Sequence, residues 1–398
     1  MATAREYRTV LVLTGLQALY QITGVVIITA GGLAGYMLAP DKSLATLPIS
    51  AWMIGTMVTT IPASLFMGRF GRRPGFALGT LFGVLSGTLA VVSLINGWFW
   101  LFCFAHVFNG AYQGFAQFYR FAAADAASPA FRSRAISYVL LGPAIAAVIG
   151  PHLVAYTKDF AASGAFVASY ATLVVLSLAA TLLVAFVDVP KPLEQKGDLP
   201  ARPLSVVVLQ SKFLLAVVTA AVGYGVMNLA MTATPLAMQA HHHGIGETAF
   251  VIQWHVLGMF LPSFFTGNLI ARFGAPRIML AGVALLLAHV TIALSGVEFI
   301  HFASALTLLG IGWNFTFLGG TNLITETYRP SEKAWAQGLN DFSIFTTVVI
   351  TSFASGALLH LFGWVGVNLL ALPLLLLVGV ALIVYQLLNR AAPAAAAG

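Results

Sequence analysis

Long apolar segments recur along almost the whole chain and restrict its fold more than any other feature. Of the 398 residues, 59% are hydrophobic and only 8% are charged, whereas charged residues make up about 25% of ordinary soluble proteins. An apolar helix of about 20 residues is long enough to cross the hydrocarbon core of a bilayer. The composition therefore predicts an integral membrane protein and excludes a soluble fold.

Apolar segments of this length are separated by short polar breaks. We count twelve, with predicted spans 9–36, 46–67, 75–95, 99–121, 135–157, 165–187, 208–236, 248–270, 277–295, 300–326, 335–359 and 365–388. The sequence thus predicts an all-α membrane protein with twelve transmembrane helices.

Lysine and arginine residues are distributed unevenly among the breaks. Basic residues in short loops are retained on the cytoplasmic side of a membrane, and in one orientation only Lys42 and Lys158 of the 19 Lys and Arg residues face outward. That orientation places both termini in the cytoplasm. The formal net charge of +7 follows from this topology, because the charges are dispersed over many loops. We therefore expect the lipid bilayer, and not a nucleic acid, to be the partner.

A polar, proline-rich stretch divides the chain into two halves. It reads DVPKPLEQKGDLPARPLS at 188–205, a composition typical of a linker. We predict an N-terminal six-helix bundle at 1–187, a cytoplasmic linker at 188–205, and a C-terminal six-helix bundle at 206–398 that ends in a short disordered tail.

The two halves share local sequence patterns. GRFGRR at 68–73 follows the second predicted helix, and ARFGAPR at 271–277 follows the eighth. Asp125 lies four residues before a proline and seven before Arg132, and Glu326 stands in the same relation to Pro330 and Lys333. Internal repeats of this kind are typical of transporters.

The loop that follows the second helix resembles the signature loop of the major facilitator superfamily. Arg69, Gly71, Arg72 and Arg73 match the superfamily's pattern, while Ser64 and Gly68 stand where it has Gly and Asp. The resemblance implies the major facilitator fold, two pseudo-symmetric six-helix bundles that work by alternating access. Together with the internal repeat and the intramembrane position of one acid, it makes five residues candidates for gating or coupling: Arg69, Arg72, Asp125, Glu326 and Asp341.

Two of these candidates are acids with distinct expected roles. Asp125 is expected to pair with Arg69, Arg72 or Arg132, although any of these basic residues could serve only to fix the topology. Asp341 lies about two turns inside the eleventh predicted helix, and an ionisable side chain at that depth is a functional candidate by default. We regard proton coupling through Asp341 as a hypothesis.

Methionine and histidine pairs at one-turn spacing suggest a metal site. Met227 with Met231, His255 with Met259, and Met53 with Met57 each fall on one helix face. Thioether and imidazole groups are neutral, and the thioether prefers Cu(I). Packing of these side chains in an apolar core is the alternative for each pair. The tract His241, His242 and His243 could capture a metal near the outer mouth or simply form a solvated loop.

The pairs in the seventh and eighth helices resemble the CcoA-like copper importers of the superfamily. That resemblance implies binding of copper by Met227, Met231, His255 and Met259, and copper uptake across the bacterial inner membrane for cytochrome oxidase assembly. Copper would be the transported substrate, with no separate cofactor, and we expect a monomer.

The alternative is an organic-solute or multidrug antiporter with an apolar, aromatic cavity. An enzyme is not expected, because the sequence shows no nucleophile and base pair, phosphate loop or closed zinc set.

Overall fold

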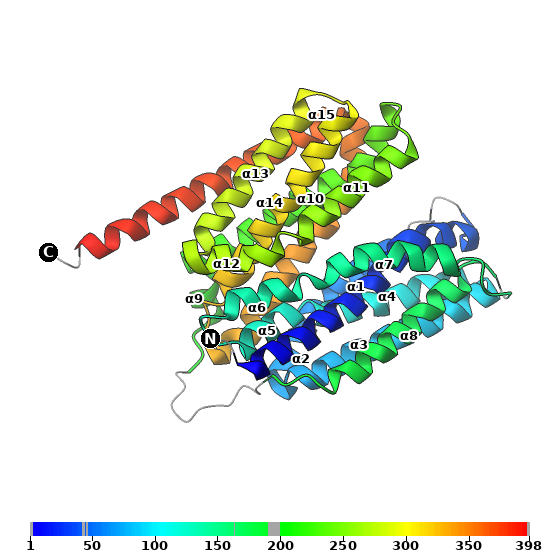
Figure 1. Ribbon diagram of the computed structural model, residues 1–398, viewed down its shortest axis with the longest axis horizontal. Coiled ribbons are helices and arrows are strands. Elements are labelled where there is room, and N and C mark those ends of the chain that lie inside the picture. The colour runs from blue at the N-terminus through cyan, green and yellow to red at the C-terminus, as the bar shows by residue number, and fades with distance from the viewer. Residues whose placement is uncertain (1–2, 42–43, 45–46, 163, 190–199, 396–398) are drawn as a thin grey trace. The chain divides into compact units, whose positions relative to one another are not determined.

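The computed structural model describes residues 3–41, 44, 47–162, 164–189 and 200–395. Lys42 and most of the predicted linker 188–205 lie outside this part of the chain, as do residues 396–398 of the expected tail. The regular elements within it are helical (Figure 1). They are α1 (Ala4–Leu38), α2 (Leu47–Phe70), α3 (Arg72–Asn96), α4 (Phe99–Ala116), α5 (Tyr119–Ala126), α6 (Arg132–Val139), α7 (Gly142–Thr157), α8 (Val167–Val184), α9 (Leu204–Val208), α10 (Ser211–Ala240), α11 (Ile245–Phe260), α12 (Ser263–Phe273), α13 (Ala275–Ser295), α14 (Phe299–Ile324), the 3₁₀ turn η2 (Pro330–Glu332) and α15 (Lys333–Ala395).

Every predicted apolar segment is helical in the described chain. Ten stretches there are long and apolar enough to cross a membrane. One of them, 330–388, contains the two predicted segments 335–359 and 365–388, which meet at a kink where Gly363 has φ 65°. The segment 99–121 forms α4 and the start of α5.

Two predicted helices are interrupted near prolines. The fifth breaks into α6 and α7 just before Pro143, and the eighth breaks into α11 and α12 at Pro262. Proline has no backbone N–H and its ring clashes with the preceding turn, so a helix bends or ends there. Proline thus coincides with these two breaks, whereas Pro62 of α2 and Pro235 of α10 lie inside continuous helices.

By its internal contacts the chain forms two compact units. Unit 1 comprises Met1–Ala201 together with Arg329–Phe345, and unit 2 comprises Arg202–Tyr328 together with Thr346–Gly398. The helix α15 therefore begins in unit 1 and continues into unit 2. The division of the chain into bundles 1–187 and 206–398, joined by the linker 188–205, remains a prediction.

Corresponding helices pack in the same way within each unit. In unit 1, α4 packs against α2 and α3; in unit 2, α14 packs against α11 and α13. This agreement gives the sequence repeat a structural counterpart.

Glycines create the closest helix crossings in both units. A Cβ atom on Gly110 of α4 would lie 2.2 Å from the Trp52 carbonyl oxygen of α2, and one on Gly310 of α14 would lie 2.4 Å from the His255 carbonyl oxygen of α11. The reciprocal glycines, Gly55 and Gly258, would meet carbonyl oxygens at 2.5 and 2.8 Å. Small residues let helices approach closely in lipid, where van der Waals packing replaces the hydrophobic effect as the driving force.

Replacing Gly110 with alanine should destabilise unit 1. The new methyl group would overlap the α2 backbone, which cannot move aside as a side chain could, so we expect a loss of about 1–3 kcal/mol. Thermal unfolding in detergent, followed by size-exclusion chromatography, measures the effect. Gly356→Ala is the matched control, because nothing lies within 4 Å of its added methyl group. Equal stability of the two variants would contradict the crossing geometry.

Candidate functional site

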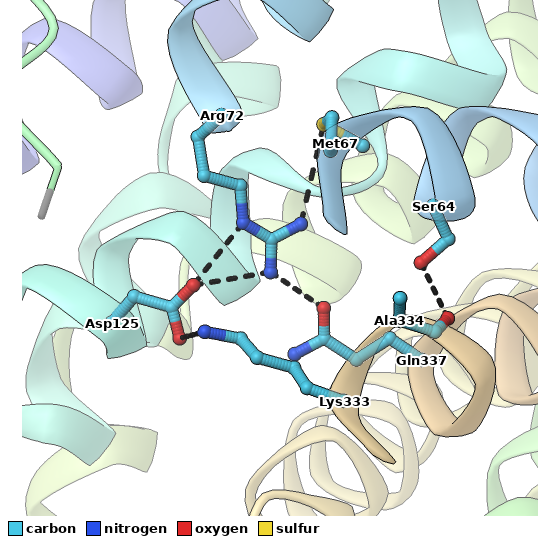
Figure 2. A network of polar contacts seen from close by, with 7 residues as sticks. All are labelled: Ser64, Met67, Arg72, Asp125, Lys333, Ala334 and Gln337. Carbon is cyan, nitrogen blue, oxygen red and sulfur yellow. Dashed lines mark hydrogen bonds and ion pairs between the residues drawn. The ribbon is translucent and has the colours of Figure 1, made fainter. Parts of the chain in front are cut away.

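A charged cluster joins the start of α15 to the rest of unit 1 (Figure 2). Arg72 donates from Nε and Nη2 to Asp125 Oδ2, both at 3.1 Å, and Lys333 Nζ lies 2.5 Å from Asp125 Oδ1. The side chains of Arg72 and Asp125 are 8% and 16% exposed. Both carboxylate oxygens of Asp125 are thus bonded to cations in a partly buried setting.

Two further contacts extend the cluster along α15. Arg72 Nη2 donates to Gln337 Oε1 at 2.6 Å, and Ser64 Oγ of α2 donates to the Ala334 carbonyl at 2.7 Å. The guanidinium of Arg72 also lies near Met67 Sδ and over the ring of Phe118. Figure 2 shows Arg72 between the Asp125 carboxylate and Gln337.

Local sequence explains how Arg72 reaches this position. Gly71, with φ 96°, separates α2 from α3, and glycine adopts positive φ without steric cost. Arg72 is then the first residue of α3 and points to α5 and α15. Gly274, with φ 84°, makes the corresponding turn between α12 and α13 in unit 2.

The five residues predicted for gating or coupling occupy different places. Asp125 pairs with Arg72, one of the three cations considered, and also with Lys333. Arg69 is exposed and lies over the ring of Phe70. Glu326 pairs with Lys212 in unit 2. Asp341 pairs with Arg120 in unit 1.

Sequence reasoning missed Gln337 and the role of Arg120. Arg120 is one of the basic residues that the predicted orientation places on the cytoplasmic side, and its side chain is only 2% exposed. The signal was Asp341 itself, because a carboxylate within a membrane-spanning helix requires a partner.

The residues predicted to bind metal lie in two units. Met53 and Met57 are half-buried on α2 of unit 1, whereas Met227 and Met231 of α10 and the pair on α11 belong to unit 2. Met227, His255 and Met259 are buried and Met231 is half-buried. Within the described chain, no group of three or more His, Cys, Asp or Glu residues is arranged to hold a metal ion. Binding of copper by these methionines and His255 remains a prediction.

His255 is fixed in one tautomer by α14. Its Nδ1 lies 2.8 Å from the Leu306 carbonyl oxygen, which can only accept, so Nδ1 carries the proton. The other ring nitrogen, Nε2, is buried and has no hydrogen-bond partner among the described residues. His255 therefore serves helix packing through one nitrogen and keeps a lone pair on the other.

The histidine tract 241–243 begins at the end of α10. His241 and His242 are exposed. His243 donates from Nε2 to the Val297 carbonyl at 2.8 Å and from Nδ1 to Glu247 Oε2 at 3.1 Å. These acceptors, the Val297 carbonyl first, raise the pKa of His243 above 6.5. Both ring nitrogens of His243 are occupied by these two acceptors, which leaves His243 poorly placed to capture a metal.

The sequence profile of the Major Facilitator Superfamily matches residues 11–254 and 215–398, which together cover nearly the whole chain. The chain belongs to the major facilitator superfamily. It is a multi-pass membrane transporter and not an enzyme, as the sequence predicted.

Relatives within the superfamily cover most or all of the chain. The riboflavin transporter RfnT of Brucella anthropi is 40% identical over 398 residues, which is 100% of this chain and 98% of that protein. The uncharacterized MFS-type transporter YddS of Bacillus subtilis is 32% identical over 354 residues. The match covers 83% of this chain and 79% of YddS. The superfamily transporter FucP, solved in the outward conformation, shares the fold with a TM-score of 0.76 at 15% identity, covering 94% of this chain and 97% of that one. A bacterial inner-membrane location agrees with the bacterial relatives.

The finer resemblance, to CcoA-like copper importers, is not supported. The relative that spans the whole chain is named for riboflavin and not for a metal. One-turn spacing of Met and His residues is equally compatible with helix packing. His255 and Met259 lie on the face of α11 whose backbone meets Gly310 of α14.

Replacing Asp125 with asparagine should destabilise the cluster. The substitution leaves Arg72 and Lys333 beside each other without their shared anion, and we expect a loss of about 1–3 kcal/mol for a partly buried pair. The midpoint of thermal unfolding in detergent measures it. Asp188→Asn removes the exposed pair with Arg5 and should leave the midpoint unchanged. An unchanged midpoint for Asp125→Asn would show that the cluster contributes nothing to stability.

The raised pKa of His243 makes its contacts depend on pH. The bonds to Glu247 and Val297 are fully present below the ordinary histidine pKa and weaken as the pH rises through the raised value. NMR of ¹³C-labelled histidine in detergent should show a ring that titrates above pH 6.5 and whose signal disappears in His243→Gln. A His243 signal that titrates at or below pH 6.5 would contradict the geometry.

Proposed function

We propose that the protein transports riboflavin, or an organic solute of similar size and aromatic character, across the bacterial inner membrane. The observation that carries the proposal is the 40% identity to a riboflavin transporter over essentially the whole of both chains. This reading corresponds to the organic-solute alternative that the sequence left open.

Aromatic side chains support the proposal physically. In unit 2, Tyr224 of α10 lies edge-on to Trp313 and Phe317 of α14, at 5.3 and 5.5 Å between ring centroids. In unit 1, Tyr20 of α1 lies 5.1 Å from Tyr112 of α4. The isoalloxazine ring of a flavin is flat and uncharged at neutral pH, so stacking and edge contacts suit it better than ion pairs.

Copper is the less supported substrate. The Met and His spacing that suggested it is compatible with helix packing, and both ring nitrogens of His243 are engaged by acceptors of the protein. The lone pair on His255 Nε2 is the feature that still favours a metal ligand, so copper belongs in the test as a second solute.

Purified protein in liposomes should catalyse riboflavin counterflow. Vesicles loaded with unlabelled riboflavin should transiently accumulate labelled riboflavin, independently of the direction in which transport operates in the cell. Copper taken up by the same vesicles should equal that of protein-free liposomes. Absence of counterflow above the protein-free background would defeat the proposed substrate, and saturable copper uptake in its place would restore the copper reading.

A variant of one aromatic residue tests the proposed contact surface. Tyr224→Leu should raise the riboflavin KM by about two- to tenfold, the equivalent of about 0.5–1.5 kcal/mol for an aromatic contact. Phe104→Leu is the matched control, because Phe104 is an exposed aromatic residue on a membrane helix. Equal KM values for both variants would exclude Tyr224 from the solute path.

A further inference from the structure

Polar residues of α15 contact unit 1 once per helical turn. Lys333, Gln337 and Asp341 are four residues apart and therefore lie on one helix face, here named the docking stripe. Their partners are Asp125, Arg72 and Arg120, at 2.5, 2.6 and 2.5 Å. The stripe lies within the part of α15 that belongs to unit 1.

The innermost contact of the docking stripe is a fully buried ion pair. The side chains of Arg120 and Asp341 are 2% and 0% exposed. Arg120 also donates to Gln117 Oε1 at 2.7 Å and lies over the ring of Phe121 at 4.7 Å. Besides Arg120 of α5, Arg72 of α3 is the charged group that acts on Asp341.

The two oxygens of Asp341 are in unequal surroundings. Oδ1 accepts from Arg120 Nη2 and from Asn340 Nδ2, the latter at 2.7 Å. Oδ2 is buried and has no hydrogen-bond partner among the described residues, and the same is true of Asn340 Oδ1. Two buried acceptors thus lack a donor, and an unsatisfied acceptor on a charged group is costly. One proton bound at Oδ2 would supply a donor at this place.

Asp125 differs from Asp341 in this respect. The Oδ2 atom of Asp125 is bonded to Arg72 and its Oδ1 atom to Lys333. Neither oxygen of Asp125 is left for a proton. Of the two carboxylates in the docking-stripe contacts, Asp341 is therefore the one suited to bind a proton.

We propose that Asp341 is a proton-binding site of the transport cycle, with Arg120 as its counter-ion. A proton binds at Oδ2, the carboxylate becomes neutral, and its attraction for Arg120 falls. The docking stripe then separates from its partners Asp125, Arg72 and Arg120. When the proton leaves Oδ2, the ion pair forms again. Because α15 continues into unit 2 at Thr346, the proton controls a helix that belongs to both units.

This proposal deepens the proposed function. It rests on secondary transport, which membership of the superfamily establishes, and it uses riboflavin only as one readout. A first experiment therefore avoids the solute altogether.

Cysteine labelling reports separation of the docking stripe. The chain has one cysteine, Cys103, so Cys103→Ser gives a cysteine-free background. Ser64→Cys then places a thiol at a site that is 1% exposed and covered by Ala334. The labelling rate of this cysteine by N-ethylmaleimide is measured at each pH and divided by the rate for Ser205→Cys, a variant at an exposed position. The ratio removes the general effect of pH on thiol reactivity.

The expected result is a relative labelling rate that rises as the pH falls. For one linked proton the rise is at most about tenfold per pH unit. In Asp341→Asn the rate should be high and independent of pH, because the amide resembles the protonated carboxyl group. Asp188→Asn should behave as the parent, and Asp125→Asn should raise the rate while keeping its pH dependence.

A parent rate without pH dependence, or a pH dependence that persists in Asp341→Asn, overturns the proposal. If Asp341→Asn fails to fold, the double variant Arg120→Gln with Asp341→Asn removes both charges together, which is far less disruptive than removing one. It must equally lose the pH dependence.

Transport supplies an independent second readout. In liposomes, a pH gradient should drive riboflavin accumulation by the parent, whereas Asp341→Asn should retain counterflow and lose gradient-driven accumulation. Accumulation by Asp341→Asn equal to that of the parent would overturn the proton site. Absence of any riboflavin transport by the parent would overturn the substrate alone, and the labelling result would still decide the proton site.

Discussion

Close approach of helix backbones at glycine is the constraint on which the rest of this fold depends. Lipid provides no hydrophobic force between apolar helices, so their contact must come from packing. The crossings of α2 with α4 and of α11 with α14 meet this need with glycines that face carbonyl oxygens. Gly258 follows Gly55 by 203 residues and Gly310 follows Gly110 by 200, so the same solution was retained in both halves of the chain.

The few charged groups of this apolar protein are concentrated in a small number of contacts. Only 8% of the residues are charged, yet three polar side chains of one α15 face contact charged residues of unit 1. The outer contact, at Asp125, has both carboxylate oxygens bonded; the inner one, at Asp341, leaves one oxygen bare. Because Asp341 is more deeply buried than Asp125 and has one oxygen without a hydrogen bond, the two carboxylates differ in their ability to bind a proton.

The sequence predicted the helices, the repeat and the superfamily, because apolar length and local motifs are written in neighbouring residues. It offered Asp125 three cations, of which Arg72 is the partner, and it did not find Lys333, which lies far away in the chain. The burial of Arg120 was not foreseen, since a basic residue near the end of a predicted helix looks the same in sequence whether it is solvated or buried. The Met and His pairs illustrate a different limit: one-turn spacing fits packing and metal binding alike, so the choice of solute came from a relative.

The four-residue spacing along α15 also determines how that helix can leave its seat. Sliding by one turn, about 5.4 Å, would bring Gln337 opposite Arg120 in one direction and Phe345 in the other. Either shift strands a buried guanidinium without an anion, and the first also brings Lys333 against Arg72. Translation along the axis is therefore costly, whereas a sideways displacement would break the three contacts together.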